Sequence, residues 1–361
     1  MARILYVAYP LLQVSEESAG GAEQILWTLE REMGRGGTHT AVAASAGSRV
    51  SGELFSTGEP CSEPDDYERR RIEHEDRVVD FVHRRAREGK AFDVIHDMSG
   101  SFWKRAAEID VPVLATLHLP RSFYPAGSFD DVPENVSFNC VSKSQARSFP
   151  DLDALAGVVP NGIAPDCFAG NDAAEINDRG RKGLLWLGRI CEEKAPHLAL
   201  EIAGRTRLPI TIAGQIYPFS YHQQYFEREV MPRLRTMPNA SFISVPPANL
   251  KRRLLQEAQA LLITSLAEET SSLVAMEAAA SGTPVIAFRR GALPEVVREG
   301  VTGFLVEDAH QAVLALQKVS GISRKACIQH AQKNFSAVKM AERYSELYER
   351  LVRPEMALRF A

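Results

Sequence analysis

Residues 269–288 read Glu-Thr-Ser-Ser-Leu-Val-Ala-Met-Glu-Ala-Ala-Ala-Ser-Gly-Thr-Pro-Val-Ile-Ala-Phe. The Thr-Ser-Ser segment offers good N-cap residues, and the run from Leu273 to Ala280 is apolar except for Glu277. Gly282 can end this helix, and Pro284 begins a short apolar strand. The stretch therefore predicts a helix that leads directly into a buried strand.

Two carboxylates accompany this helix. A helix that is apolar nearly all round should be buried, so Glu277 needs a partner, a cleft or a ligand. The free N–H groups at the helix start can hold a phosphate, and Glu269 lies just before them. In the alternative interpretation, Glu277 lies on a solvent-facing strip and Glu269 is an ordinary helix-start acid.

Composition limits the class of protein. The 361 residues suggest two domains, and the net charge of −4 gives no case for nucleic-acid binding. The five cysteines are scattered and form no C-x-x-C pair, which favours a reducing compartment over disulfides or a zinc site. The start becomes polar too early for a signal peptide, and no apolar run of about 18 residues occurs. We expect a cytoplasmic protein.

Short apolar strands alternate with helical stretches along the whole chain, which predicts an α/β fold with parallel sheets. Two sets of strands are separated near the polar residues 171–181, so we expect two doubly wound, Rossmann-like domains that face each other across a cleft. The expected strands are Ile4–Ala8, Thr40–Ala44, Val94–His96, Val113–Leu117, Ser137–Val141, Val158–Val159, Leu184–Leu187, Ile210–Ala213, Ala240–Ile243, Ala260–Ile263, Val285–Phe288 and Gly303–Val306. Ligands of such sheets bind outside the carboxyl ends of the strands.

Several candidate residues follow strands. Gly20 and Gly21 precede a helix, where a ligand can approach the backbone closely, although the spacing is not that of the dinucleotide fingerprint. Arg189 and Lys194 follow a strand and suit a diphosphate, unless they are a solvated surface pair. His118 ends a strand, where it could contact a sugar hydroxyl or polarise a reacting group.

Other polar features have simpler explanations. His96 also ends a strand, but we interpret it as structural. Residues 62–90 carry interleaved charges and predict an amphipathic surface helix, with Ile72 on its apolar face, in preference to a lipid-binding one. Residues 46–66 are interpreted as a loop. Asp151-Leu-Asp153 follows no apolar strand, so we expect no bound metal.

The ordered set of motifs resembles the retaining glycosyltransferases of family four, which have the GT-B fold. The resemblance extends over nearly the whole chain and is most specific from 184 to 306. Its pieces are Gly20-Gly21-Ala-Glu, Thr116-Leu-His118, Gly188-Arg189 with Glu193-Lys194, Ala213-Gly214, Glu269-x7-Glu277, Gly282-Thr-Pro284, Gly291-x2-Pro294-Glu295 and Tyr344-x3-Tyr348.

This resemblance implies transfer of a sugar from a nucleotide-diphosphate donor of the UDP, GDP or dTDP type to a hydroxyl acceptor. It implies an acceptor domain at 1–165, a donor domain at 166–337, and a helix within 338–361 that crosses back to the first domain. The acceptor would be a small molecule, a lipid-linked compound or a polysaccharide. The protein itself would make at most peripheral contact with a membrane. No cofactor or metal is implied.

By motif position, the resemblance gives roles to residues. Glu277 would accept the ribose hydroxyls, Glu269 would lie at the donor sugar, and His118 would contact the transferred sugar. Arg189 and Lys194 would neutralise the diphosphate. The remaining donor-binding positions would be Gly20, Gly21, Gly188, Gly214, Thr270, Ser271, Ser272 and Leu273.

One departure separates this chain from the family pattern. The family commonly has Gly-Phe-Gly after the first acid, where this chain has Thr270-Ser271-Ser272. The side chains added there can narrow the sugar pocket or add hydroxyl contacts. A nucleotide-sugar sensor without catalytic activity is the alternative, and a sugar-nucleotide epimerase is a weaker one. The residues do not decide between a covalent intermediate and same-face attack.

Overall fold

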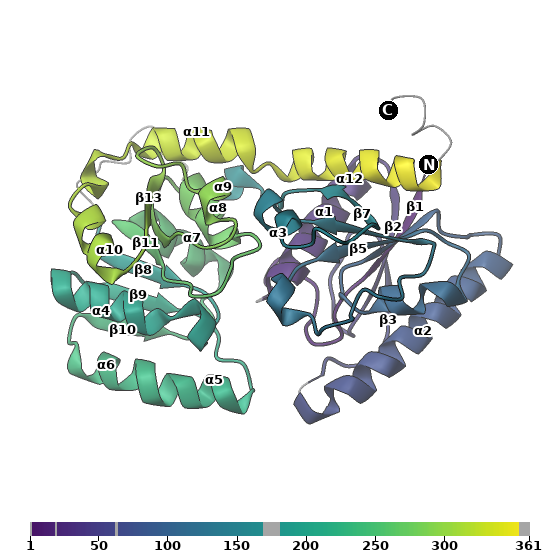
Figure 1. The fold of residues 1–361 in the computed structure, drawn as a ribbon, viewed down its shortest axis with the longest axis horizontal. Helices are drawn as coiled ribbons and strands as arrows, with labels where there is room; N and C mark the ends of the chain where they lie inside the picture. The colour runs from purple at the N-terminus through teal and green to yellow at the C-terminus, as the bar shows by residue number, and fades with distance from the viewer. Residues whose placement is uncertain (1, 19, 62–63, 169–180, 354–361) are drawn as a thin grey trace. The chain divides into compact units, whose positions relative to one another are not determined.

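The computed structural model describes residues 2–18, 20–61, 64–168 and 181–353 and divides into two compact units. The first unit contains the residues up to Gly162 together with the helix that begins at Ala337, and the second unit is Ile163–Ser336. The polar separator near 171–181 lies outside the described residues except for Arg181, and so do positions 354–361 of the expected returning helix. Each unit is an α/β sandwich with a parallel sheet (Figure 1).

The first unit has a seven-stranded parallel sheet in the order β3-β2-β1-β4-β5-β6-β7. Its strands are β1 (Arg3–Val7), β2 (His39–Ala44), β3 (Glu53–Ser56), β4 (Val94–Asp97), β5 (Val113–Leu117), β6 (Val136–Cys140) and β7 (Leu155–Val158). Its helices are α1 (Gly21–Arg35), α2 (Tyr67–Arg87), α3 (Lys143–Arg147) and α12 (Ala337–Val352).

The second unit has a six-stranded sheet in the order β10-β9-β8-β11-β12-β13. Its strands are β8 (Leu184–Leu187), β9 (Ile210–Ala213), β10 (Ala240–Ile243), β11 (Ala260–Ile263), β12 (Val285–Phe288) and β13 (Gly303–Val306). Its helices are α4 (Pro196–Thr206), α5 (Ser220–Tyr225), α6 (Met231–Thr236), α7 (Ala248–Glu257), α8 (Leu273–Ala280), α9 (Leu293–Val296), α10 (Ala309–Leu316) and α11 (Arg324–Asn334).

The central strands are apolar on both faces because helices cover both faces of a parallel sheet. Leu184 and Trp186 of β8 pack into one hydrophobic core, while Leu185 between them packs into the core on the opposite face. This arrangement confirms the predicted doubly wound α/β fold in each unit. The six strands expected in the second unit have the predicted bounds.

The first unit differs from expectation at two strands. β3 lies within the segment that we interpreted as a loop, because this edge strand is short and only half-buried and so leaves little apolar pattern. The strand expected at Val158–Val159 is instead β7, which begins at Leu155 and pairs with β6 through an irregular register.

Helix α12 packs on the sheet of the first unit through buried tyrosines (Figure 1). The hydroxyl of Tyr348 lies 2.7 Å from Nδ1 of His96, and Asn139 donates to the hydroxyl of Tyr344 at 3.1 Å. His96 also lies 2.6 Å from the hydroxyl of Thr116, so both ring nitrogens are satisfied in a buried network. The predicted return of the C-terminal helix to the first domain is confirmed, and His96 is placed in the interior.

Most arginines of α2 make contacts with nearby residues. Arg71 pairs with Glu68 and Glu75, Arg69 pairs with Glu73, and Arg70 donates to the carbonyl of Thr57. Ile72 is 45% exposed, so the expectation that it belongs to the packed apolar face is wrong. Within the described ranges, no helix is both long enough and apolar enough to cross a membrane.

Candidate functional site

The strand order of the second unit reverses between β8 and β11, which are neighbours although β9 and β10 separate them in sequence. Loops from neighbouring parallel strands diverge at such a point and leave a crevice at the carboxyl edge. The loop after β8 carries Arg189 and Lys194, and the loop after β11 carries Glu269. The topology therefore brings together residues that lie 75 positions apart in the sequence.

Lys194 and Glu269 form a two-pronged ion pair. The ammonium of Lys194 donates to both carboxylate oxygens of Glu269 at 2.6 and 2.7 Å. The Glu269 side chain is only 9% exposed, whereas that of Lys194 is 33% exposed. Among the residues that the structure describes, the counter-ion of this largely buried acid is the flexible Lys194, which can also reach an anion brought in from solvent.

Hydrogen bonds to backbone carbonyls hold the two loops together around this pair. Thr264 donates its hydroxyl to the carbonyl of Ala195 at 2.8 Å, and Ser265 donates to the carbonyl of Glu193 at 3.1 Å. The N–H of Leu266 donates to the same Glu193 carbonyl at 2.8 Å. Sequence reasoning missed Thr264 and Ser265, because a hydroxyl after a strand gives no signal until its carbonyl partner is known.

Two predicted glycines lie against each other at this edge. A Cβ added to Gly214 would lie 1.7 Å from the carbonyl oxygen of Gly188, so a side chain cannot fit there. The N–H of Gly188 donates to the carbonyl of Ala213 at 3.1 Å. The two glycines let the loops after β8 and β9 approach closely, which sets the course of the backbone before Arg189.

The loop after β12 fixes the backbone of Glu269. Gly291 has φ +52°, and a Cβ there would lie 2.2 Å from the carbonyl oxygen of Glu269. The N–H of Ala292 donates to that carbonyl at 2.7 Å. Gly291 combines the left-handed backbone with the lack of a side chain, and both are needed for this close packing.

Glu277 lies on α8 with its side chain only 4% exposed, as the apolar helix predicted. Lys251 of α7 donates to Oε1 of Glu277 at 2.7 Å. The other oxygen, Oε2, is buried and has no hydrogen-bond partner among the described residues. The interpretation of Glu277 as a solvent-facing acid is therefore wrong. Lys251 was not predicted, since pairing between α7 and α8 depends on how the two helices pack.

The start of α8 leaves donors available for a ligand. Ser272 is the N-cap, with an extended backbone and no side-chain hydrogen bond to the helix, and Leu273 begins the helix. The hydroxyl of Ser271 is buried without a hydrogen-bond partner in the part of the chain that the structure describes. In most helices the N-cap side chain accepts a hydrogen bond from the first N–H groups. Here the hydroxyl and N–H groups can instead donate to a ligand such as a phosphate.

Arg189 is half-buried and stacks on an aromatic ring. Its guanidinium carbon lies 5.6 Å from the centre of the Tyr217 ring. Stacking of this kind holds the planar fork in one orientation, and the guanidinium also interacts electrostatically with Cys191 and Glu193 of the same loop.

Gly20, Gly21 and His118 belong to the first unit, at the carboxyl edge of its sheet. A Cβ on Gly20 would lie 1.9 Å from the carboxylate of Glu23, which folds back over the start of α1. Burial lowers the pKa of His118 to about 4, so its imidazole is neutral at pH 7. A neutral imidazole can exchange hydrogen bonds with a sugar but does not supply a fixed positive charge.

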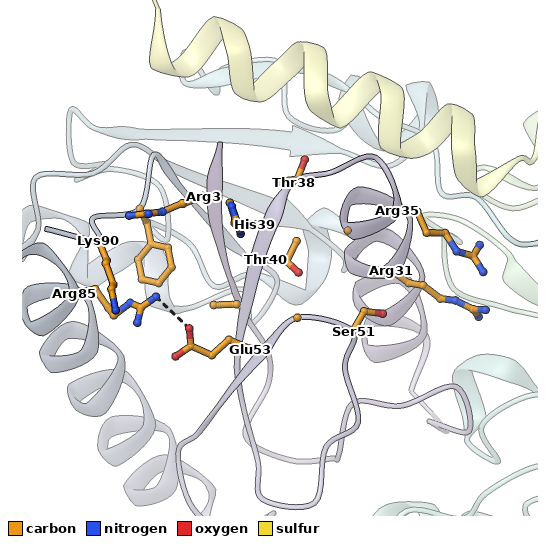
Figure 2. Close-up of a pocket in the computed structure, with 14 residues that line it drawn as sticks. Arg3, Arg31, Arg35, Thr38, His39, Thr40, Ser51, Glu53, Arg85 and Lys90 are labelled. Carbon is orange, nitrogen blue, oxygen red and sulfur yellow. Dashed lines mark ion pairs between the residues drawn. The ribbon is translucent and has the colours of Figure 1, made fainter. Parts of the chain in front are cut away.

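A pocket of about 770 Å³ occupies a different part of the first unit, at the amino ends of β1, β2 and β3 (Figure 2). Three of the cations that line it have partners, since Arg85 pairs with Glu53, Arg35 pairs with Glu32, and Arg31 lies over the ring of Trp27. Arg3 and Lys90 line it as well. Ligands of doubly wound sheets bind at the carboxyl ends of the strands, and this pocket lies at the opposite edge of the sheet.

Comparison with known proteins identifies the second unit. Residues 181–320 match the family model described as glycosyl transferases group 1. The D-inositol 3-phosphate glycosyltransferase of Kribbella flavida is 28% identical over 291 residues, which cover 68% of each chain. The spore coat protein SA of Bacillus subtilis is 25% identical over 198 residues, or 49% of this chain and 51% of that one. This chain spans between 34% and 52% of the length of the first curated relatives that it matches.

Solved structures share the whole fold at low sequence identity. A sucrose-phosphate synthase of Thermosynechococcus elongatus aligns with a TM-score of 0.77 at 19% identity and covers 98% of this chain and 100% of that one. AviGT4, a glycosyltransferase involved in avilamycin A biosynthesis, aligns with a TM-score of 0.70 at 21% identity and 98% coverage of both chains. Residues 181–320 are thus a group 1 glycosyltransferase domain, and the chain has the GT-B fold of two Rossmann-like units.

Proposed function

We propose that this chain is a retaining glycosyltransferase that moves a sugar from a nucleotide-diphosphate sugar to a hydroxyl acceptor, with no metal ion in the transfer step. The observation that carries the proposal is the Lys194–Glu269 ion pair at the strand-order reversal of the second unit. A cation for the diphosphate and a buried acid for the sugar stand there in direct contact.

In the proposed reaction, the bond between the anomeric carbon and the diphosphate oxygen breaks, and negative charge grows on the leaving diphosphate. Arg189 and Lys194 stabilise that charge, together with the N–H groups at the start of α8. The diphosphate draws the Lys194 ammonium from Glu269 as it binds. Glu269 is then released to accept hydrogen bonds from the hydroxyls of the donor sugar.

Glu277 is proposed to hold the ribose of the nucleotide. Its Oε2 atom is buried without a hydrogen-bond partner among the described residues, and a buried unsatisfied carboxylate oxygen is costly. A ribose hydroxyl supplies the missing donor. Lys251, bonded to the other oxygen, fixes the orientation of the carboxylate and offsets its charge.

The first unit is proposed to supply the acceptor side. Gly20 and Gly21 would admit the diphosphate near the start of α1, provided that the Glu23 carboxylate moves aside. Neutral His118 would contact the transferred sugar. The acceptor is a hydroxyl of a small molecule, a lipid-linked compound or a polysaccharide. No disulfide joins the five cysteines within the described residues, which supports a reducing, cytoplasmic setting for the reaction.

A thermal-shift screen with UDP, GDP and dTDP tests the donor. The structures of Anabaena HepE in complex with UDP and glucose and with UDP-glucose make UDP the first choice. The preferred nucleotide should raise the melting temperature of the wild type but not that of a Glu277→Ala variant. If none of the three stabilises the wild type, the nucleotide assignment is wrong.

Product analysis tests the finer chemistry. NMR of the first-formed product should show the anomeric configuration of the donor, and turnover should need no added Mg²⁺ or Mn²⁺. An inverted product would overturn the retaining mechanism. Turnover that is lost in a chelator and recovered with Mg²⁺ or Mn²⁺ but not with Zn²⁺ would overturn metal independence of the transfer step.

A further inference from the structure

Cys191, Glu193 and His222 form a cluster of metal-binding side chains in the second unit. One ligand atom from each residue, the thiol sulfur, a carboxylate oxygen and a ring nitrogen, lies within 4.8 Å of the other two. Cys191 and Glu193 come from the loop after β8, and His222 comes from α5. This combination was not predicted, because sequence reasoning tested for zinc only through pairs of cysteines.

Burial and missing hydrogen bonds single out this cluster. His222 and Cys191 are both fully buried. Neither ring nitrogen of His222, nor Oε2 of Glu193, has a hydrogen-bond partner among the described residues. Buried polar atoms are nearly always paired, so an imidazole with two unsatisfied nitrogens beside an unsatisfied carboxylate oxygen and a thiol indicates a missing partner.

We propose that Cys191, Glu193 and His222 bind a divalent transition-metal ion, with zinc as the natural occupant. Mixed sulfur, nitrogen and oxygen ligands suit zinc, which takes them at about 2.0–2.3 Å in a tetrahedron. Those bond lengths place the ligands roughly 3.3–3.7 Å apart, so shifts on the order of 1 Å close this cluster around an ion. The fourth position is filled by water.

Binding a divalent ion changes the charges of the cluster. Binding converts the Cys191 thiol to a thiolate and releases its proton to the solvent, so the thiolate and the Glu193 carboxylate together neutralise the metal. The Cys191 thiol donates to the backbone carbonyl of Arg189 at 3.6 Å and gives up this hydrogen bond when it binds the metal. The Arg189 guanidinium interacts electrostatically with Cys191, Glu193 and His222, so the ion is held beside a fixed positive charge. The ion joins α5 to the loop that carries Arg189 and Lys194, and its water occupies an open coordination position, unlike the closed four-ligand sites of structural zinc. It takes no part in the transfer step proposed above.

Metal content and cobalt spectroscopy test this site directly. We expect purified wild-type protein to hold about one zinc per chain, and the metal-free protein loaded with cobalt to show a near-ultraviolet thiolate-to-cobalt absorption band. Cys191→Ser should abolish the band, and His222→Gln should remove stoichiometric zinc. Cys327→Ser changes another buried cysteine of the same unit and should keep both properties.

The outcomes are independent of enzymatic activity. If wild-type protein binds neither zinc nor cobalt at about one ion per chain, the proposal is wrong even when donor turnover is observed. It is equally wrong if the cobalt band persists in Cys191→Ser or is lost in Cys327→Ser. Should Cys191→Ser fail to fold, the zinc content of His222→Gln and the wild-type cobalt spectrum still decide the question.

Discussion

The chemistry of the donor site depends on one competition, in which Lys194 can bind either Glu269 or an incoming diphosphate. In the structure the carboxylate of Glu269 holds the ammonium through two short hydrogen bonds. Each donor molecule that binds must therefore break this pair. The competition predicts different effects on nucleotide binding and on sugar transfer.

Replacing Glu269 by Gln should separate these two effects. UDP carries no sugar, so the variant should bind it several-fold more tightly, since Lys194 is freed and a negative charge is removed. Transfer should fall by about 10²- to 10³-fold, because an interaction with the reacting sugar is lost. Calorimetry and turnover measurements check the pair of effects, with exposed Glu229→Gln as a matched control. Weaker UDP binding in Glu269→Gln would contradict the competition.

Glu277 allows a similarly specific test through its proposed ribose contacts. Removing the ribose hydroxyls from the nucleotide should weaken binding to the wild type by about 1.5–3 kcal/mol, the range for hydrogen bonds to a charged group. The Glu277→Ala variant should bind the normal and the deoxy nucleotide with nearly equal affinity. If removing the ribose hydroxyls weakens binding to Glu277→Ala as much as it weakens binding to the wild type, the ribose binds elsewhere.

At the scale of elements, helix α12 completes the first unit through hydroxyl groups as well as apolar contacts. Tyr348→Phe removes the partner of His96 Nδ1 while keeping the aromatic ring. We expect this change to cost about 1–3 kcal/mol in the free energy of unfolding, because a buried imidazole nitrogen is left unpaired. Urea unfolding measures it, with exposed Tyr221→Phe as the control. A change no larger than that of the control would show that the network adds no stability.

Some elements of the fold and of the candidate site could be predicted from the sequence, and others could not. The short buried apolar strands and the apolar helix around Glu277 were predictable, since their patterns are continuous in the chain. Strand β3 was missed because an edge strand of four half-exposed residues carries almost no pattern. Lys251 and Thr264 were missed because their partners are set by packing between elements, which no local spacing encodes. The cluster of Cys191 with His222 was missed for the same reason.

At the scale of the whole molecule, buried histidines make the stability of the first unit depend on pH. Burial lowers the pKa of His74 and of His118 from 6.5 to about 4. As the pH falls, the unfolded chain therefore binds these protons before the folded chain does. The stabilisation by the two neutral histidines is thus complete above pH 6.5, and the free energy of unfolding falls between pH 6.5 and 4. Asp97 acts in the opposite direction below pH 6, because burial raises its pKa to about 6.

The variant His118→Asn isolates one part of this dependence. It should lose less stability than the wild type between pH 7 and pH 5, by an amount on the order of 1–3 kcal/mol in the free energy of unfolding. Urea denaturation at the two pH values gives the comparison. Equal losses in the two proteins would show that His118 titrates normally in the folded state.

Release of nucleoside diphosphate from a nucleotide sugar tests the proposed function most directly. We predict that the wild type releases it when acceptor is present and that Lys194→Ala lowers the rate by about 10²- to 10³-fold. Arg205→Ala, which removes an exposed arginine paired with Glu201 in the same unit, should leave the rate unchanged. Nucleotide binding without release from any donor, or an unchanged rate in Lys194→Ala, would contradict the account.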